Sequence, residues 1–154
     1  ENEIAITKAS HNHDLANYWM HVGRIDMQDE KMSKSLGNTI LVKDLENPIS
    51  YRLLILNHHY RNPINYTLTL MDEMHQMYDK IKRTLMRTAL KYGLNTHKEI
   101  DLEIINTFNK HMENDFNTPN VITQIIEEMK NLNKTTDEYT AIKIYNSIRG
   151  LWNI

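Results

Sequence analysis

Cysteine is absent from the 154-residue sequence, and glycine, proline and phenylalanine are scarce. Without cysteine the chain can form no disulfide, no thiol nucleophile and no zinc site from thiolates of its own. This absence favours a reducing compartment, and we expect a cytoplasmic location. The four glycines are Gly23, Gly37, Gly93 and Gly150, so neither G-x-G-x-x-G nor G-x-x-x-x-G-K-[ST] can be written. Two common nucleotide-binding loops are therefore excluded.

Long hydrophobic runs and a large excess of one charge are also missing. No run approaches the roughly 20 apolar residues of a membrane span, and residues 1–20 lack the basic start and apolar block of a secretory signal. The net charge is −2 and the pI is about 6.5, so any contact with nucleic acid requires a local basic patch. With 40% hydrophobic and 25% charged residues, the composition is that of a folded globular chain. We expect no association with membranes.

The sequence divides into an irregular part and a helical part. Residues 1–63 contain Gly23, Gly37, Pro48 and Pro63 among short apolar runs, whereas residues 64–154 are typical of successive helices. The predicted fold class is mainly α, with a short β or irregular connector followed by an antiparallel helical bundle. Because the chain begins Glu-Asn-Glu without an initiating methionine, we expect a piece of a longer protein.

Two short elements are predicted in residues 1–63. The imperfect apolar alternation from Val22 to Met27 predicts a strand that ends in a turn at residues 28–30. Asn47-Pro48 has the form of an N-cap followed by a proline at the first helical position. It predicts a buried helix that runs to about His59 and is closed by Pro63.

Four amphipathic helices are predicted in residues 64–154. The first runs from Thr67 to Gly93, where glycine can adopt the left-handed conformation that ends a helix. The segments 96–99, 118–119 and 135–138, which begin with Thr96, Thr118 and Thr135, have the form of helix starts and open the other three. Their apolar positions, which we expect to form the bundle core, are Met71, Met74, Tyr78, Ile81, Leu85 and Tyr92, then Leu102, Ile105, Phe108 or Asn109, Met112 and Phe116, then Ile122, Ile125, Ile126 and Met129, and finally Ile142, Tyr145, Ile148 and Trp152.

The segment Lys31–Asn38, K-M-S-K-S-L-G-N, carries the most chemistry. Lys31 and Lys34, separated and followed by Ser33 and Ser35, can present two ammonium groups and several amides to a polyphosphate from one loop. Taken alone, such a pair of lysines beside serines is usually an exposed, solvated loop. The spacing therefore leaves both interpretations open.

As a whole word, K-M-S-K-S-L-G-N resembles the second signature of class I aminoacyl-tRNA synthetases in every letter. The flanking words narrow the resemblance to the cysteinyl-tRNA synthetases, and no word after residue 119 is specific enough to count. These words are ENEIA at 1–5, NYWMH at 17–21, HYRNPINY at 59–66 and DFNTP at 115–119.

The resemblance implies a parent enzyme with a Rossmann-like α/β catalytic domain, most of which is absent here. Such an enzyme uses ATP and Mg²⁺ to convert L-cysteine to cysteinyl-adenylate, and transfers the aminoacyl group to tRNA(Cys). Residues 1–63 would be the end of the catalytic domain with the KMSKS-loop connector, and residues 64–154 a truncated tRNA-binding helical domain. By position, Lys34 would hold the ATP phosphates in the transition state and Lys31 would assist. Met32, Ser33 and Ser35 would complete the ATP-binding loop.

The same resemblance implies parts that this sequence lacks. The family holds a zinc ion with two cysteines, a histidine and a glutamate, and Glu3 falls on the position of the glutamate. The other three ligands would lie before Glu1, so we expect Zn²⁺ in the parent protein and not in this chain. The H-I-G-H signature, which cradles ATP, is also absent. We therefore expect the chain to form no adenylate by itself.

A basic stretch lies on the first predicted helix of the bundle. Between Lys80 and Lys91 there is no acidic residue, and the tRNA-binding candidates there are Lys80, Arg83, Arg87 and Lys91. A basic helix face can neutralise tRNA phosphates, although it can equally be a solvated face. The expected partners are tRNA(Cys), L-cysteine and ATP, for a protein that acts as a monomer. Two alternatives are a class I cysteine ligase with a non-tRNA acceptor and a non-catalytic helical interaction module.

Overall fold

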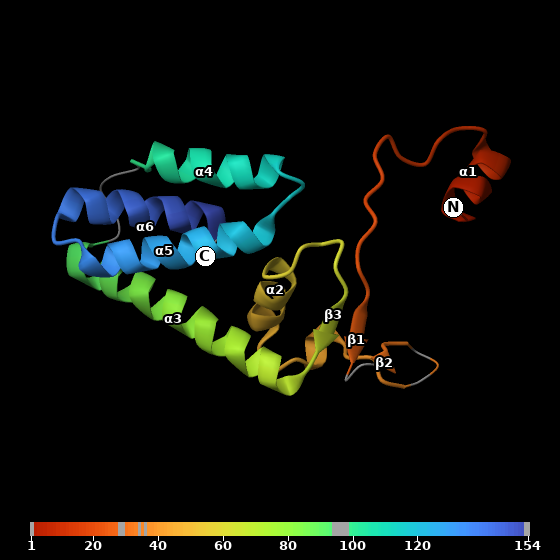
Figure 1. The fold of residues 1–154 in the computed structure, drawn as a ribbon, viewed down its shortest axis with the longest axis horizontal. Coiled ribbons are helices and arrows are strands. Elements are labelled where there is room, and N and C mark those ends of the chain that lie inside the picture. The colour runs from red at the N-terminus through yellow and green to blue at the C-terminus, as the bar shows by residue number, and fades with distance from the viewer. Residues whose placement is uncertain (1, 28–29, 34, 36, 94–98, 153–154) are drawn as a thin grey trace.

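The computed structural model describes residues 2–27, 30–33, 35, 37–93 and 99–152. A helix at the start of the chain, α1 (Asn2–His11), is joined to the remainder by an extended segment and lies apart from it (Figure 1). A small sheet follows, then the helix α2 (Pro48–Leu56), and the helix α3 (Leu68–Tyr92) leads from the sheet to the other helices. The mainly α fold class is confirmed. Within the described residues, no helix has both the length and the apolar character needed to cross a bilayer.

The small sheet has three strands in the order β2-β1-β3, namely β2 (Glu30–Lys31), β1 (Ile25–Met27) and β3 (Ile64–Tyr66). The strand predicted within residues 22–27 is confirmed as β1. It pairs antiparallel with β2, where Asp26 faces Lys31, and parallel with β3, where Ile25 faces Ile64. The turn predicted at 28–30 falls partly outside the described residues, and Glu30 belongs to a strand.

Strand β3 is absent from the sequence prediction, which assigned Pro63 only the role of closing a helix. Its three residues alternate buried, exposed and buried, too short a pattern to distinguish from a loop. The preceding helix, α2, ends at Leu56 and not near His59. Its Leu53 and Leu54 are fully buried, and α2 packs mainly against α3.

The helix α3 (Leu68–Tyr92) has the predicted ends. The Thr67 side chain accepts a hydrogen bond from the Leu70 backbone N–H at 3.1 Å, and Gly93 follows with a φ of 78°. Thr88, which lies between the predicted core positions Leu85 and Tyr92 on the same face of α3, is buried, and its hydroxyl donates to the Thr84 carbonyl at 3.0 Å. This local bond satisfies the one polar group that interrupts the stripe.

The starts of two later helices differ from prediction. The helix α4 (Leu102–Glu113) is capped by Asp101, whose carboxylate accepts a hydrogen bond from the Glu103 N–H at 2.9 Å. Of the start predicted at 96–99, residues 96–98 lie outside the described residues and Glu99 is not helical. In α6 (Glu138–Trp152) the Thr140 N–H donates to the Asp137 carboxylate, whereas Thr135 ends the preceding helix, α5 (Thr118–Lys134). In both cases a carboxylate close to the first turn replaces the predicted threonine as the cap.

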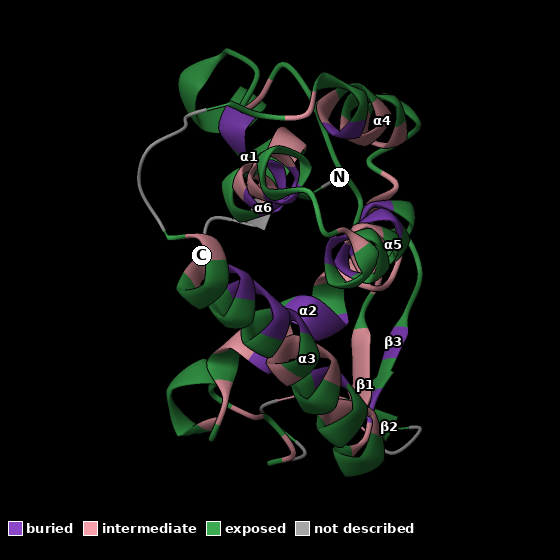
Figure 2. Cartoon of the chain, turned by 90° about the vertical axis from the view of Figure 1, so that its left-hand side faces the viewer, coloured by how far each residue is buried: buried purple, intermediate pink, exposed green. Residues whose placement is uncertain are grey.

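The helices α3, α5 and α6 pack against one another, and α4 packs on α5 and α6. Figure 2 shows buried residues on each of the first three. Ile81, Ile125 and Ile148, all predicted core positions, are at most 2% exposed. Two predicted core positions are wrong: Leu102 is 67% exposed and Phe116, which lies beyond the end of α4, is 48% exposed. The side chain of Trp152 lies outside the described residues.

Candidate functional site

The loop predicted to bind phosphates, residues 31–38 and here called the signature loop, begins at the outer strand of the sheet. Lys31 is the second residue of β2, pairs with Asp26 of β1, and is exposed. Because β2 lies at the end of the strand order, the loop leaves the sheet at its edge, away from the helical bundle (Figure 1). Of the described residues of the loop, Lys31 and Ser35 are exposed and can be reached by a ligand.

The Asn38 side chain closes the base of the signature loop. Its Oδ1 accepts from the Ser33 backbone N–H at 2.8 Å, and its Nδ2 donates to the Lys31 carbonyl at 3.2 Å. The preceding residue, Gly37, has a φ of 67°, in the region that favours glycine. One amide side chain therefore joins the two ends of the loop. Sequence reasoning gave Asn38 no role, although an asparagine directly after a glycine is a turn signal.

The structure describes some of the predicted ATP-binding residues and not others. The hydroxyl oxygens of Ser33 and Ser35 lie 3.1 Å apart, and Met32 and Ser33 are half-buried. Lys34, the residue to which the resemblance gives the main role, lies outside the described residues, and its role stays a prediction. The structure thus brings together Lys31, Ser33 and Ser35 around the closure made by Asn38.

The predicted tRNA-binding residues form one stripe along α3, because their spacing of three and four residues repeats with the helix. All four are exposed. Arg87 donates to the Asn133 side chain of α5, and the Lys91 ammonium donates to the Tyr92 hydroxyl at 2.7 Å. Lys80 and Arg83 line a groove of about 520 Å³ between α3 and α5, together with Lys130. Where Lys80 and Arg83 line this groove, Lys130 of α5 therefore adds a third positive charge.

The described residues do not provide a zinc site. Glu3, the predicted ligand of the parent protein, lies on α1 and is exposed. Among the residues that the structure places, no three histidine, aspartate or glutamate side chains come close enough to hold a metal ion. Zinc therefore does not fit the donor groups of this part of the chain.

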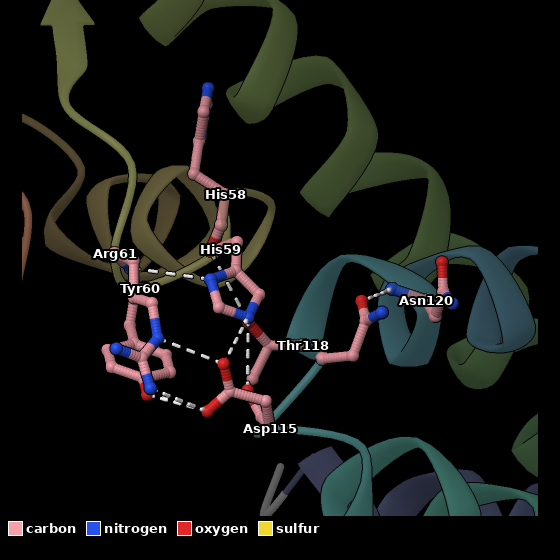
Figure 3. A network of polar contacts seen from close by, with 8 residues as sticks. His58, His59, Tyr60, Arg61, Asp115, Thr118 and Asn120 are labelled. Carbon is pink, nitrogen blue, oxygen red and sulfur yellow. Dashed lines mark hydrogen bonds and ion pairs between the residues drawn. The ribbon is translucent and has the colours of Figure 1, made fainter.

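A polar junction, here defined as His59, Tyr60, Arg61 and Asp115, joins the loop before β3 to the corner between α4 and α5 (Figure 3). Arg61 Nε and Nη2 donate to the two oxygens of Asp115 at 2.9 and 3.3 Å, and the Tyr60 hydroxyl donates to Oδ1 at 2.7 Å. His59 Nε2 lies 3.0 Å from the Asp115 carbonyl oxygen. Sequence reasoning used HYRNP and DFNTP only as family words and missed this contact between them.

The polar junction perturbs the titration of its members. Hydrogen bonds from Arg61 and then Tyr60 lower the pKa of the Asp115 carboxyl below its usual value. The reciprocal bond to Asp115 raises the pKa of the Tyr60 hydroxyl and that of the Arg61 guanidinium. At neutral pH the junction therefore consists of a carboxylate, a guanidinium and a neutral phenol.

Two family models match the sequence. One is described as the catalytic domain of tRNA synthetases class I (C) and matches residues 1–76, and the other is described as the DALR domain and matches residues 107–153. A cysteine–tRNA ligase of Acholeplasma laidlawii is 46% identical over 153 residues, which cover 96% of this chain and 34% of the relative. The chain belongs to the cysteinyl-tRNA synthetase family. The resemblance inferred from the words around the signature loop is thereby confirmed.

Other relatives show the same partial overlap. A cysteine–tRNA ligase of Onion yellows phytoplasma is 40% identical over 159 residues, covering 100% of this chain and 36% of the relative. One of Acinetobacter baumannii is 36% identical over 160 residues, covering 100% and 34%. The chain thus spans about a third of the length of the curated relatives it matches. The predicted division between residues 63 and 64 stays a prediction.

Proposed function

We propose that this chain is a segment of a cysteine–tRNA ligase, and that it contributes a phosphate-binding loop and a tRNA-contacting helical region. The parent enzyme uses ATP and Mg²⁺ to activate L-cysteine and passes the cysteinyl group to tRNA(Cys). The observation that carries the proposal is the signature loop closed at its base by Asn38, within a family whose named members are cysteine–tRNA ligases. We place the parent in the cytoplasm as a monomer, with zinc bound by Glu3 together with three ligands from outside this chain.

The signature loop acts on the ATP phosphates by electrostatics. As the bond to the leaving pyrophosphate breaks, negative charge grows on its oxygens, and a preorganised cation or N–H group stabilises this charge more than it stabilises bound ATP. Lys34 supplies the main cation and Lys31 the second. The hydroxyls of Ser33 and Ser35 and the loop amides supply neutral donors. The remainder of the ATP site, including the H-I-G-H word, belongs to residues outside this chain.

The test is cysteine-dependent exchange of pyrophosphate into ATP by the full-length protein that contains this chain. Exchange that requires cysteine and magnesium supports a class I cysteine ligase. Absence of exchange in a folded full-length protein contradicts the proposal and favours the non-catalytic helical module. A cysteine ligase with a non-tRNA acceptor also passes this test. Charging of tRNA(Cys) with cysteine distinguishes it from a cysteine–tRNA ligase.

Replacing Asn38 by alanine is expected to loosen the signature loop without removing any cation. Both hydrogen bonds that close the base are lost, at about 1 kcal/mol each. The expected result in the full-length enzyme is a fall of up to about thirtyfold in the exchange rate at subsaturating ATP. Asn106→Ala, at an exposed position on α4, is the matched control and should leave exchange unchanged. If Asn38→Ala also leaves exchange unchanged, the closure has no part in ATP binding.

We propose that the part of the α3 stripe that lines the groove, Lys80 and Arg83, contacts tRNA phosphates. Each phosphate contact releases counterions, so Lys80→Ala should lower the slope of log affinity against log salt by about 1 for binding of tRNA to the full-length protein. Lys82 is the control, because it is exposed on the same helix two positions away and points in a different direction. An equal change of slope with Lys82→Ala would show that only net charge matters.

A further inference from the structure

The polar junction has a continuous backbone connection to the signature loop. The Gly23 N–H donates to the Tyr60 carbonyl at 2.7 Å, and the Ile64 N–H donates to the Arg24 carbonyl at 2.9 Å. Strand β1 then pairs with β3 on one side and with β2, which opens the signature loop, on the other. The Tyr60 segment and the sheet that carries the signature loop are therefore joined through the backbone.

The approach between these two segments is close. A Cβ atom at Gly23 would lie 2.1 Å from the Asn62 carbonyl oxygen and 2.8 Å from the Pro63 nitrogen, so only glycine fits without movement of the backbone. The backbone of residues 60–63 is therefore in close contact with Gly23, which lies two residues before β1. This contact and the two backbone hydrogen bonds make the sheet and the loop before β3 one unit.

On its other side, the polar junction is attached to the helical bundle. Asp115 lies between α4 and α5, and the next residues bond back to the end of α4: the Phe116 N–H donates to Met112 and the Asn117 N–H to His111, both at 3.0 Å. The Asn117 side chain also accepts from the Asn120 N–H at the start of α5. Asp115 is therefore held by the ends of α4 and α5, whereas Arg61 belongs to the loop before β3.

We infer that Arg61 and Asp115 are positioning residues that hold the helical bundle at one orientation relative to the sheet with the signature loop. The inference rests on the proposed function. A tRNA bound along α3 must deliver its 3′ end to an adenylate formed beside the signature loop, so its transfer step depends on this orientation. Of this chain's residues, adenylate formation uses only those of the signature loop, on one side of the junction, so we expect it not to depend on the pair.

The chemistry of the pair suits orientation better than it suits stability. The Asp115 and Arg61 side chains are 47% and 58% exposed, so water and salt screen their attraction. Two parallel N–H···O bonds, however, fix the angle between the groups as well as their distance. The Tyr60 hydroxyl and His59 add contacts to the same aspartate from the same loop.

The experiment measures both steps in the full-length enzyme for Arg61→Met, Asp115→Asn and the double variant. For each variant we expect kcat for tRNA charging to fall about tenfold and pyrophosphate exchange without tRNA to stay within twofold. The double variant should fall no further than the singles, because both remove one interaction. Arg52→Met, at an exposed position on α2, is the matched control for loss of an arginine and should leave both steps unchanged.

Three outcomes overturn the inference. Charging that stays within twofold of wild type shows that the pair does not orient the bundle, and equal losses in exchange and charging show a general defect of folding. Multiplicative losses in the double variant would show that the two residues act separately, which also contradicts it. If the wild-type enzyme shows no cysteine-dependent exchange, it is the proposed function that fails.

Discussion

Replacing Lys34 by alanine is expected to slow cysteine-dependent pyrophosphate exchange by about a hundredfold in the full-length enzyme. Loss of one preorganised donor aimed at charge that develops in the transition state costs roughly 3 kcal/mol, which corresponds to this factor. The loss should appear in kcat, with a smaller change in KM for ATP, because the contact strengthens as the pyrophosphate leaves. Exchange of radiolabelled pyrophosphate into ATP at saturating cysteine measures it.

The control for Lys34 is Lys43→Ala, an exposed lysine on the short 3-10 helix Val42–Asp44. Loss of an exposed lysine of this kind should leave exchange unchanged, since it removes the same charge from outside the signature loop. If Lys34→Ala behaves like Lys43→Ala, the lysines form an ordinary solvated loop. The second interpretation of the motif, left open by its spacing, would then be correct.

Replacing Gly23 by alanine is expected to separate the sheet from the loop before β3. The added Cβ meets backbone atoms of Asn62 and Pro63, which have no side-chain freedom with which to yield. Overpacking of this kind costs about 3 kcal/mol. Hydrogen exchange of the Ile64 and Met27 amides, measured by mass spectrometry on segments 21–27 and 60–66, should become about a hundredfold faster.

The chain offers a matched glycine for this comparison. A Cβ at Gly150 in α6 meets nothing within 4 Å, so Gly150→Ala should stabilise the helix by about 0.5–1 kcal/mol. Loss of protection with Gly23→Ala and none with Gly150→Ala supports the account of the close approach. Unchanged protection with Gly23→Ala would mean that the backbone adjusts at little cost.

Much of the helical fold could be predicted because its signals are local. A threonine cap, a long apolar stripe and a terminal glycine define α3, and all three act within one helix. Where several capping residues lie close together, the sequence does not say which one is used, and Asp101 and Asp137 replaced the predicted threonines. Strand β3 depends on pairing with β1, nearly forty positions earlier, and its three residues carry no periodicity of their own.

The candidate site also has parts that the sequence predicts and parts that it does not. The word K-M-S-K-S-L-G-N can be recognised from its letters, so the signature loop was found from the sequence. The closure by Asn38 and the polar junction depend on where side chains lie in three dimensions. Arg61 and Asp115 are 54 residues apart, and no spacing rule relates them. The signal that could have indicated them was present, since both lie within words already assigned to the family.

The most direct test of the account is the charging of tRNA(Cys) with radiolabelled cysteine by the full-length protein that contains this chain. We expect cysteinyl-tRNA to form only with ATP, in amounts that Lys34→Ala reduces strongly and Arg61→Met reduces moderately. Cysteine-dependent pyrophosphate exchange with no label transferred to tRNA would contradict it. That result would assign the protein to the cysteine ligases that use another acceptor.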